Sequence, residues 1–91
     1  MSKTYYERLP RNPEDLTRGI VAERLADAQI ELSQAQDTLT REWNEGESST
    51  FETRDKLYEA IDLLRGLVEA LALRDQIRYN AKIEEESKNA N

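Results

Sequence analysis

Apolar residues between positions 57 and 77 recur at steps of three and four, which is the spacing of a helix with one buried face. Two such lines run side by side through this stretch. The first line consists of Leu57, Ala60, Ile61, Leu64, Leu67, Val68 and Leu71, and the second of Leu63, Leu67, Ala70, Leu73 and Ile77. Because a single partner helix cannot cover both lines, the pattern predicts a helix at the centre of an assembly larger than one chain.

A second apolar pattern precedes this one and predicts a long helix over residues 13–45. Its members are separated by 4, 3, 4, 3 and 4 positions, the heptad spacing of a helix–helix seam. They are Val21, Leu25, Ala28, Leu32, Ala35 and Leu39. Asn12 is a suitable cap, Pro13 suits the first helical position, and Gly46 is a suitable left-handed stop.

The remaining boundaries follow from turn and capping signals. Ser49, with Glu52 three residues later, has the pattern of a capping box, so the second helix is predicted over residues 50–82. Residues 84–91 are charged and polar, so we expect the tail over residues 83–91 to fray. Residues 1–12 form a short leader, in which Pro10 and Pro13 disfavour a long helix.

Two long helices joined by a short turn lie antiparallel. Pairing positions about the turn places Leu32 opposite Ile61 and Leu25 opposite Val68. Several apolar residues then lack cover within one chain, and burying each is worth roughly 1.5–3 kcal/mol. They are Leu16, Ile20, Leu63, Leu67, Leu73 and Ile77. The sequence therefore predicts a single all-α domain, residues 1–91, an antiparallel helical hairpin that self-associates into a helical bundle such as a dimeric four-helix bundle.

The composition argues against an enzyme. The 91 residues include no cysteine and no histidine, so the usual metal ligands and the usual general base are absent. The acidic residues lie outside the apolar seam, where a solvated face is the simplest interpretation. An enzyme resembling helical chorismate mutases would need arginines inside the bundle, and Arg65, Arg74 and Arg78 have no reason to point inward. We predict no catalytic residue, no metal site and no cofactor.

The net charge of −6 is concentrated in residues 23–53, which hold eight acids and two bases. Such a segment favours docking on a basic protein partner or imitation of nucleic acid, and a duplex-DNA binder would show a basic stripe instead. Arg65, Glu69 and Arg74 interrupt the longest apolar stretch, so no membrane span is expected. Residues 1–11 do not resemble a signal peptide, which makes a cytoplasmic location the default expectation.

The leader combines aromatic rings with cations, in Lys3, Tyr5, Tyr6, Arg8 and Arg11. Aromatic rings stack on nucleic-acid bases and arginine binds phosphate, so this composition is suited to a nucleotide. The alternative is that the tyrosines plug the open end of the hairpin while the cations stay in water. In that arrangement Leu9 and the tyrosines lie near Leu73, Ile77 and Ile83.

The chain also resembles the small phage hairpin proteins known as anti-CBASS and anti-Thoeris sponges. The resemblance covers residues 5–78 and rests on Tyr6 with Leu9 three residues later, Arg24 in the first helix, and Arg54 followed by Gly66 in the second. It departs by two extra residues around Pro10–Pro13 and by an arginine where a lysine is usual. The resemblance implies a non-enzymatic homo-oligomer that sequesters a cyclic-nucleotide immune signal without cleaving it. The candidate ligand-binding residues are Tyr5, Tyr6, Arg8, Arg11 and Arg24.

Overall fold

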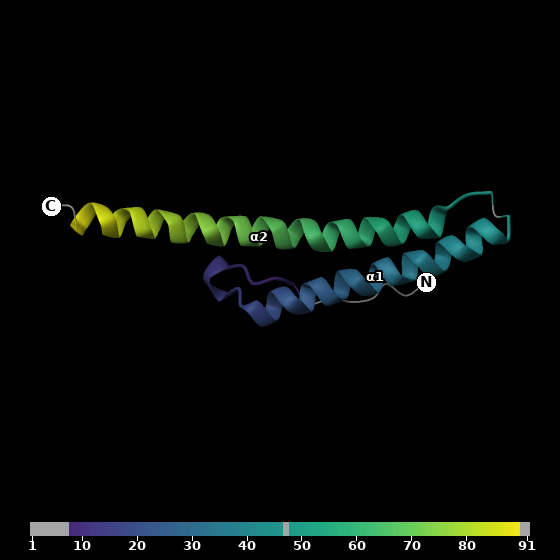
Figure 1. Ribbon diagram of the computed structural model, residues 1–91, viewed down its shortest axis with the longest axis horizontal. Coiled ribbons are helices and arrows are strands. Elements are labelled where there is room, and N and C mark those ends of the chain that lie inside the picture. Colours follow the sequence, from purple (N-terminus) through teal and green to yellow (C-terminus); the bar gives the residue numbers. More distant parts are fainter. Residues whose placement is uncertain (1–7, 47, 90–91) are drawn as a thin grey trace.

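The computed structural model describes residues 8–46 and 48–89 as a long antiparallel helical hairpin, 71 × 19 × 15 Å in extent (Figure 1). A short 3₁₀ turn, η1 (Pro13–Asp15), precedes helix α1 (Arg18–Asn44) and helix α2 (Phe51–Asn89). No strand occurs in the described ranges. The prediction of an all-helical hairpin is confirmed. Within the same ranges, neither long helix contains a stretch apolar enough to cross a bilayer.

The beginning of α1 differs from the prediction because an extended residue separates two helical segments. Asn12 does cap a helical turn, since its side chain accepts from the Glu14 amide at 3.0 Å, but this turn is only η1. Leu16 then takes an extended backbone and buries its side chain. Thr17 caps the long helix by accepting from the Ile20 amide at 3.2 Å, so α1 begins at Arg18 and not at Pro13.

The turn confirms the predicted stop and corrects the predicted end of α2. Gly46 has a φ of 68°, the left-handed conformation in which glycine is favoured. Helix α2 continues to Asn89, well beyond the expected end at residue 82, so residues 83–89 are helical where the sequence predicted a frayed tail. Neither glycine nor proline follows Gly66, and Lys88 lies in the last turn, where a cation favours the helix dipole. The C-terminal part of α2 therefore projects beyond α1 (Figure 1).

The seam between the helices is rich in alanine and polar residues. The buried apolar side chains are Leu16, Ala28, Ala35, Ala60, Leu63 and Leu67. Glu31, Glu42 and Thr53 are buried among them. The prediction that Leu63, Leu67 and Leu16 lack cover is wrong, whereas Leu73 and Ile77 are exposed as predicted.

The predicted α1 seam is only half correct. Ala28 and Ala35 do face α2, but Leu25, Leu32 and Leu39 are each more than 40% exposed. The observed inward line advances from Arg24 through Ala28, Glu31, Ala35 and Thr38 to Glu42, again at steps of four and three. The helix is rotated so that polar side chains of this line reach α2, which turns the leucines to one side.

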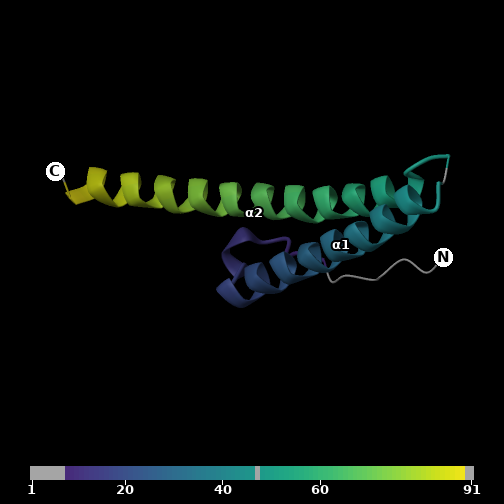
Figure 2. The ribbon, with the colours of Figure 1, turned by 45° about the vertical axis from the view of Figure 1, so that its right-hand side comes forward.

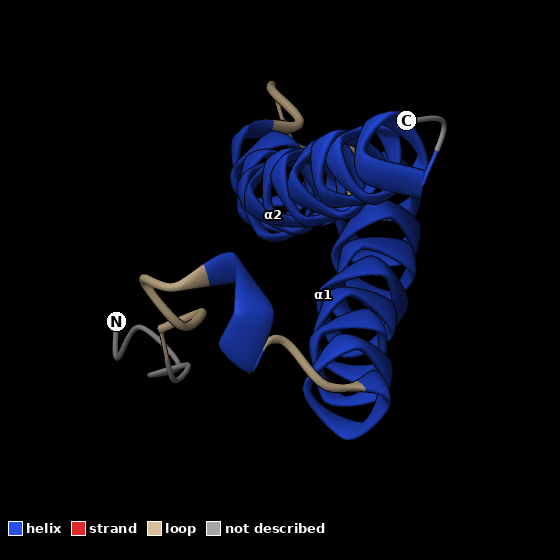
Figure 3. Cartoon of the chain, turned by 90° about the vertical axis from the view of Figure 1, so that its left-hand side faces the viewer, coloured by secondary structure: helices blue, strands red, loops and turns tan. Residues whose placement is uncertain are grey.

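The described part of the leader, residues 8–12, lies in the angle between the helices. The helices are closest near the turn and diverge toward the open end, where residues 8–12 and η1 lie beside α2 (Figures 1 and 2). The end-on view shows η1 on one side of the hairpin (Figure 3). A Cβ built on Gly66 lies 3.7 Å from Leu9 Cδ1, so Leu9 docks at Gly66 and not near Leu73, Ile77 and Ile83. Tyr5 and Tyr6 lie outside the described residues.

Candidate functional site

The turn end of the hairpin is joined by a carboxylate that caps the opposite helix. Glu42 of α1 accepts hydrogen bonds from the Glu52 amide at 3.0 Å and from the Thr53 amide at 2.9 Å. The Thr53 hydroxyl donates to the same carboxylate at 2.5 Å. Because these amides belong to the first turn of α2, the carboxylate also neutralises the positive end of the helix dipole. The predicted capping box is absent: Glu52 pairs with Arg41 instead.

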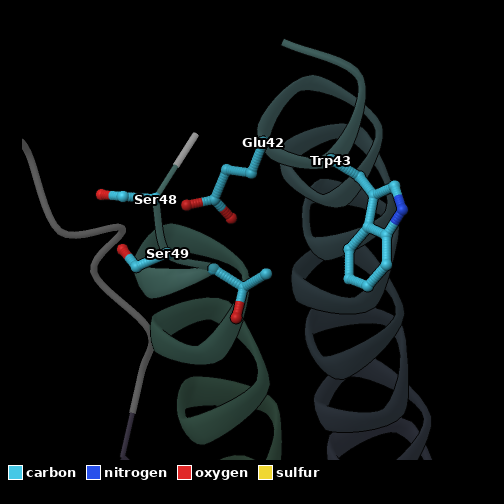
Figure 4. A pocket seen from close by; sticks show the side chains of 5 residues that line it. Glu42, Trp43, Ser48 and Ser49 are labelled. Atoms are coloured by element: carbon cyan, nitrogen blue, oxygen red, sulfur yellow. The ribbon is translucent and has the colours of Figure 1, made fainter. Parts of the chain in front are cut away.

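A hollow of about 380 Å³ lies beside this cap, lined by Glu42, Trp43, Ser48, Ser49 and Thr50. Figure 4 shows Glu42 directed toward the start of α2, with the indole of Trp43 and the serine hydroxyls on different sides of it. The pKa of Glu42 is lowered, chiefly by the Thr53 hydroxyl and further by the Thr53 and Glu52 amides and by Arg41, against an opposing desolvation effect. A carboxylate so stabilised repels anions, so this hollow is unsuited to phosphate.

A second hollow, of about 240 Å³, lies at the open end of the hairpin. Its lining comes from three elements that only the fold brings together: the segment after η1, the start of α1 and the middle of α2. The lining residues are Leu16, Thr17, Arg18, Val21, Leu71 and Arg74. Three aliphatic residues give the hollow a mostly apolar lining, and two arginines, Arg18 and Arg74, also line it. This combination is suited to a ligand that has both an apolar ring and a negative charge.

The two arginines of this open-end hollow differ in their surroundings. Arg18 is the first residue of α1 and is exposed. Arg74 is half-buried, and its guanidinium lies 3.6 Å from the carboxylate of Asp75, which is 72% exposed. A long contact to an exposed carboxylate is worth less than about 1 kcal/mol, so it leaves Arg74 able to bind a phosphate.

The middle of the seam holds a second group of ionisable residues. Glu31 is completely buried, and Lys56 Nζ lies 3.6 Å from its carboxylate. Glu59 of α2 lies close enough to Glu31 for the two carboxyls to influence each other's ionisation. Desolvation raises the pKa of Glu59, and the hydrogen bond and negative charge of Glu31 raise it further. Among residues 8–46 and 48–89, no group of three or more histidine, cysteine, aspartate or glutamate residues could hold a metal ion.

Of the predicted ligand-binding residues, the structure describes Arg8, Arg11 and Arg24. Arg8 and Arg11 are exposed on the leader, and Arg24 is half-buried on the side of α1 that faces α2. Tyr5 and Tyr6 lie outside the described residues. The sequence analysis did not predict that Arg18 and Arg74 line the same hollow at the open end. Thr17 could have indicated it, because a second capping residue after Pro13 marks a start of α1 at Arg18.

In comparisons with known proteins, no family model, no curated protein and no solved structure matches the chain.

Proposed function

We propose that this protein is a non-enzymatic, homo-oligomeric binding protein that sequesters a small anionic nucleotide in the cytoplasm without cleaving it. The observation that carries the proposal is the open-end hollow, whose lining combines the aliphatic residues Leu16, Val21 and Leu71 with Arg18 and Arg74. An apolar lining accepts a base, and arginine binds phosphate with charge-assisted hydrogen bonds. The resemblance to phage sponges supplies the ligand class, a cyclic oligonucleotide.

The site has no group suited to cleaving a phosphodiester. The hollow contains two arginines and one threonine as its polar residues, and arginine stays protonated at any physiological pH. General-base catalysis needs a group whose pKa lies near the working pH. Retention of an intact ligand is therefore the chemistry that these residues support.

The experiment is native mass spectrometry of the purified protein with a panel of cyclic di- and trinucleotides. We expect an oligomer that gains nucleotide mass in a fixed ratio to subunits. The double variant Arg18→Gln, Arg74→Gln should bind at least about tenfold more weakly, because each arginine–phosphate contact contributes roughly 1.5–3 kcal/mol. Arg65→Gln, an exposed arginine on α2 away from the hollow, is the matched control and should bind like the parent protein.

Two results would refute this function. One is an oligomer that ignores every nucleotide of the panel, and the other is unchanged binding by the double variant. A companion variant, Tyr6→Ala with Arg8→Ala, measures whether the leader contributes to the ligand contact that the sequence predicts.

The second function left open by the sequence, an acidic module that docks on a basic protein, has less support. Of the acids in residues 23–53, Glu31 and Glu42 are buried and Glu52 is paired with Arg41. These charges serve contacts within the hairpin, so the acidic surface is smaller than the sequence indicates. Charge reversal at Glu45 and Glu47 should leave nucleotide binding unchanged, whereas it would abolish docking on a basic partner.

A further inference from the structure

One broad side of the hairpin is apolar and uncovered. On α1 its residues each follow a residue of the seam by one position, as Leu32 follows Glu31, and on α2 Ile61 follows Ala60 in the same way. Because the helices are antiparallel, this one-residue step turns toward the same side of the hairpin on both. The resulting apolar face consists of Leu25, Leu32, Leu39, Leu57, Ile61 and Val68. These side chains are 40–64% exposed.

The opposite side of the hairpin is covered in part by other segments of the chain. Gly66, where Leu9 docks, precedes the buried Leu67 by one position and therefore lies on the other side from Val68. The Arg41–Glu52 ion pair also joins residues that precede the seam positions Glu42 and Thr53. Leu9 and this ion pair cover parts of that side, where Ile30 remains 48% exposed as a single apolar residue, whereas the apolar face is a continuous row of exposed apolar side chains.

The chemistry of the apolar face specifies an uncharged partner. Between Ala22 and Trp43, the α1 positions on this side are leucine, alanine, glutamine and tryptophan, and between Leu57 and Leu71 the α2 positions are all aliphatic. The two apolar stripes each extend over about 14 residues, or about 21 Å of helix. A charged partner would be desolvated against them without compensation.

The hairpin buries few large apolar side chains, so we expect the folded chain to depend on a partner that stays bound. Of the six buried apolar side chains among residues 8–46 and 48–89, three are alanines, and the other three are Leu16, Leu63 and Leu67. A domain with so few large buried side chains is poorly stabilised as a monomer, so it needs a partner from the time it folds. A second copy meets this requirement, because its apolar face has the same length and lacks charge in the same way.

We propose that two copies of this chain pack through their apolar faces, each presenting the same patch to the other in a two-fold, four-helix arrangement. The inference deepens the proposed function, because it assigns the self-association to a defined face. Arg18 and Leu71 follow in the same lines as Leu25 and Leu64, so the open-end hollow adjoins this face. A second copy on the apolar face therefore borders the hollow.

The test compares two glutamate substitutions on the same helix. Leu32→Glu places a charge in the apolar face, and Ile30→Glu places one on a different side of α1 at a position of similar exposure, 48% against 42%. Sedimentation velocity at micromolar concentration should show the parent protein and Ile30→Glu as oligomers. Leu32→Glu should require at least tenfold higher concentration to associate. Trp43, 73% exposed in the single chain, borders the apolar face and should show a blue-shifted emission in the oligomer.

A second measurement covers the case in which Leu32→Glu does not fold. The Tm of the parent protein should rise with protein concentration, because association stabilises only the folded chain. The inference is overturned by a helical parent monomer with a concentration-independent Tm, which would assign the face to a different partner. Equal effects of the two substitutions on association overturn it as well. Since mass is read separately from nucleotide binding, an oligomer without ligand refutes the proposed ligand alone, and a ligand-binding monomer refutes this interface alone.

Discussion

The two ends of the hairpin are held together by different forces. At the turn end, Glu42 binds two amides and a hydroxyl of α2, and Thr38 and Thr53 share a hydrogen bond of 3.0 Å. Toward the open end, Leu63 and Leu67 of α2 are buried, as is Leu16 from the segment after η1. Polar contacts of defined geometry hold one end, and apolar packing holds the other.

This difference explains how a seam rich in alanine attains a single arrangement. Hydrogen bonds depend on direction, so the contacts of Glu42 fix both the register and the rotation of α1 against α2. Apolar contacts depend mainly on area, so they tolerate the divergence of the helices and the insertion of the leader. The turn end therefore sets the geometry, and the open end supplies most of the buried apolar volume.

The largest effect is expected from Leu67→Ala, which empties the open end. Leu67 is 3% exposed, and truncation of a leucine at such a position costs roughly 2–4 kcal/mol of unfolding free energy. Chemical denaturation followed by circular dichroism measures it. Leu73→Ala, at 52% exposure on the same helix, is the matched control and should cost well under about 1 kcal/mol. If both variants lose the same stability, the open end is not held by buried apolar contacts.

A smaller effect is expected from Glu42→Ala, which removes the cap of α2. The Glu52 and Thr53 amides lose their acceptor, so Tm should fall by about 4–8 °C, as for the loss of one good N-cap in a domain of this size. Glu42→Gln retains an acceptor oxygen and should recover part of the loss. Glu45→Ala, an exposed acid at the end of α1, should leave Tm nearly unchanged. An equal fall in Glu45→Ala would show that general charge, and not capping, sets the stability of the turn.

The sequence was sufficient for the helices and their order, but not for their rotation. Ala28 and Ala35 belong both to the predicted leucine line and to the observed polar line, so apolar spacing alone does not distinguish the two. The choice depends on Glu31, Thr38 and Glu42, whose partners on α2 are known only after the turn is built. The open-end hollow was missed for a different reason: the predicted antiparallel pairing brings Arg18 near position 75, but the hollow also needs the extended Leu16 and the start of α1 at Arg18, which the sequence analysis did not predict.

The smallest effect is a pH dependence in which the turn end and the middle of the seam act in opposite directions. The pKa of Glu42 is lowered from the usual value of 4.5, so its contribution to stability is present above that pH and is lost as the pH falls through the lowered pKa. The pKa of Glu59 is raised above 4.5 by desolvation and by Glu31, so its contribution is present below that pH and is lost as the pH rises. Together the two carboxyls favour the folded hairpin most near pH 4.5.

The variant Glu59→Gln separates these two contributions. An amide donates to the Glu31 carboxylate without a titrating proton, while Lys56 remains beside Glu31 and Asp55 remains near position 59. The decline in Tm above pH 4.5 should therefore be weaker in Glu59→Gln than in the parent protein, whereas the decline at lower pH should remain. Thermal melts at a series of pH values measure both limbs. If Glu59→Gln leaves the upper limb unchanged, the hydrogen bond between Glu31 and Glu59 does not couple protonation to folding, and only the turn end responds to pH.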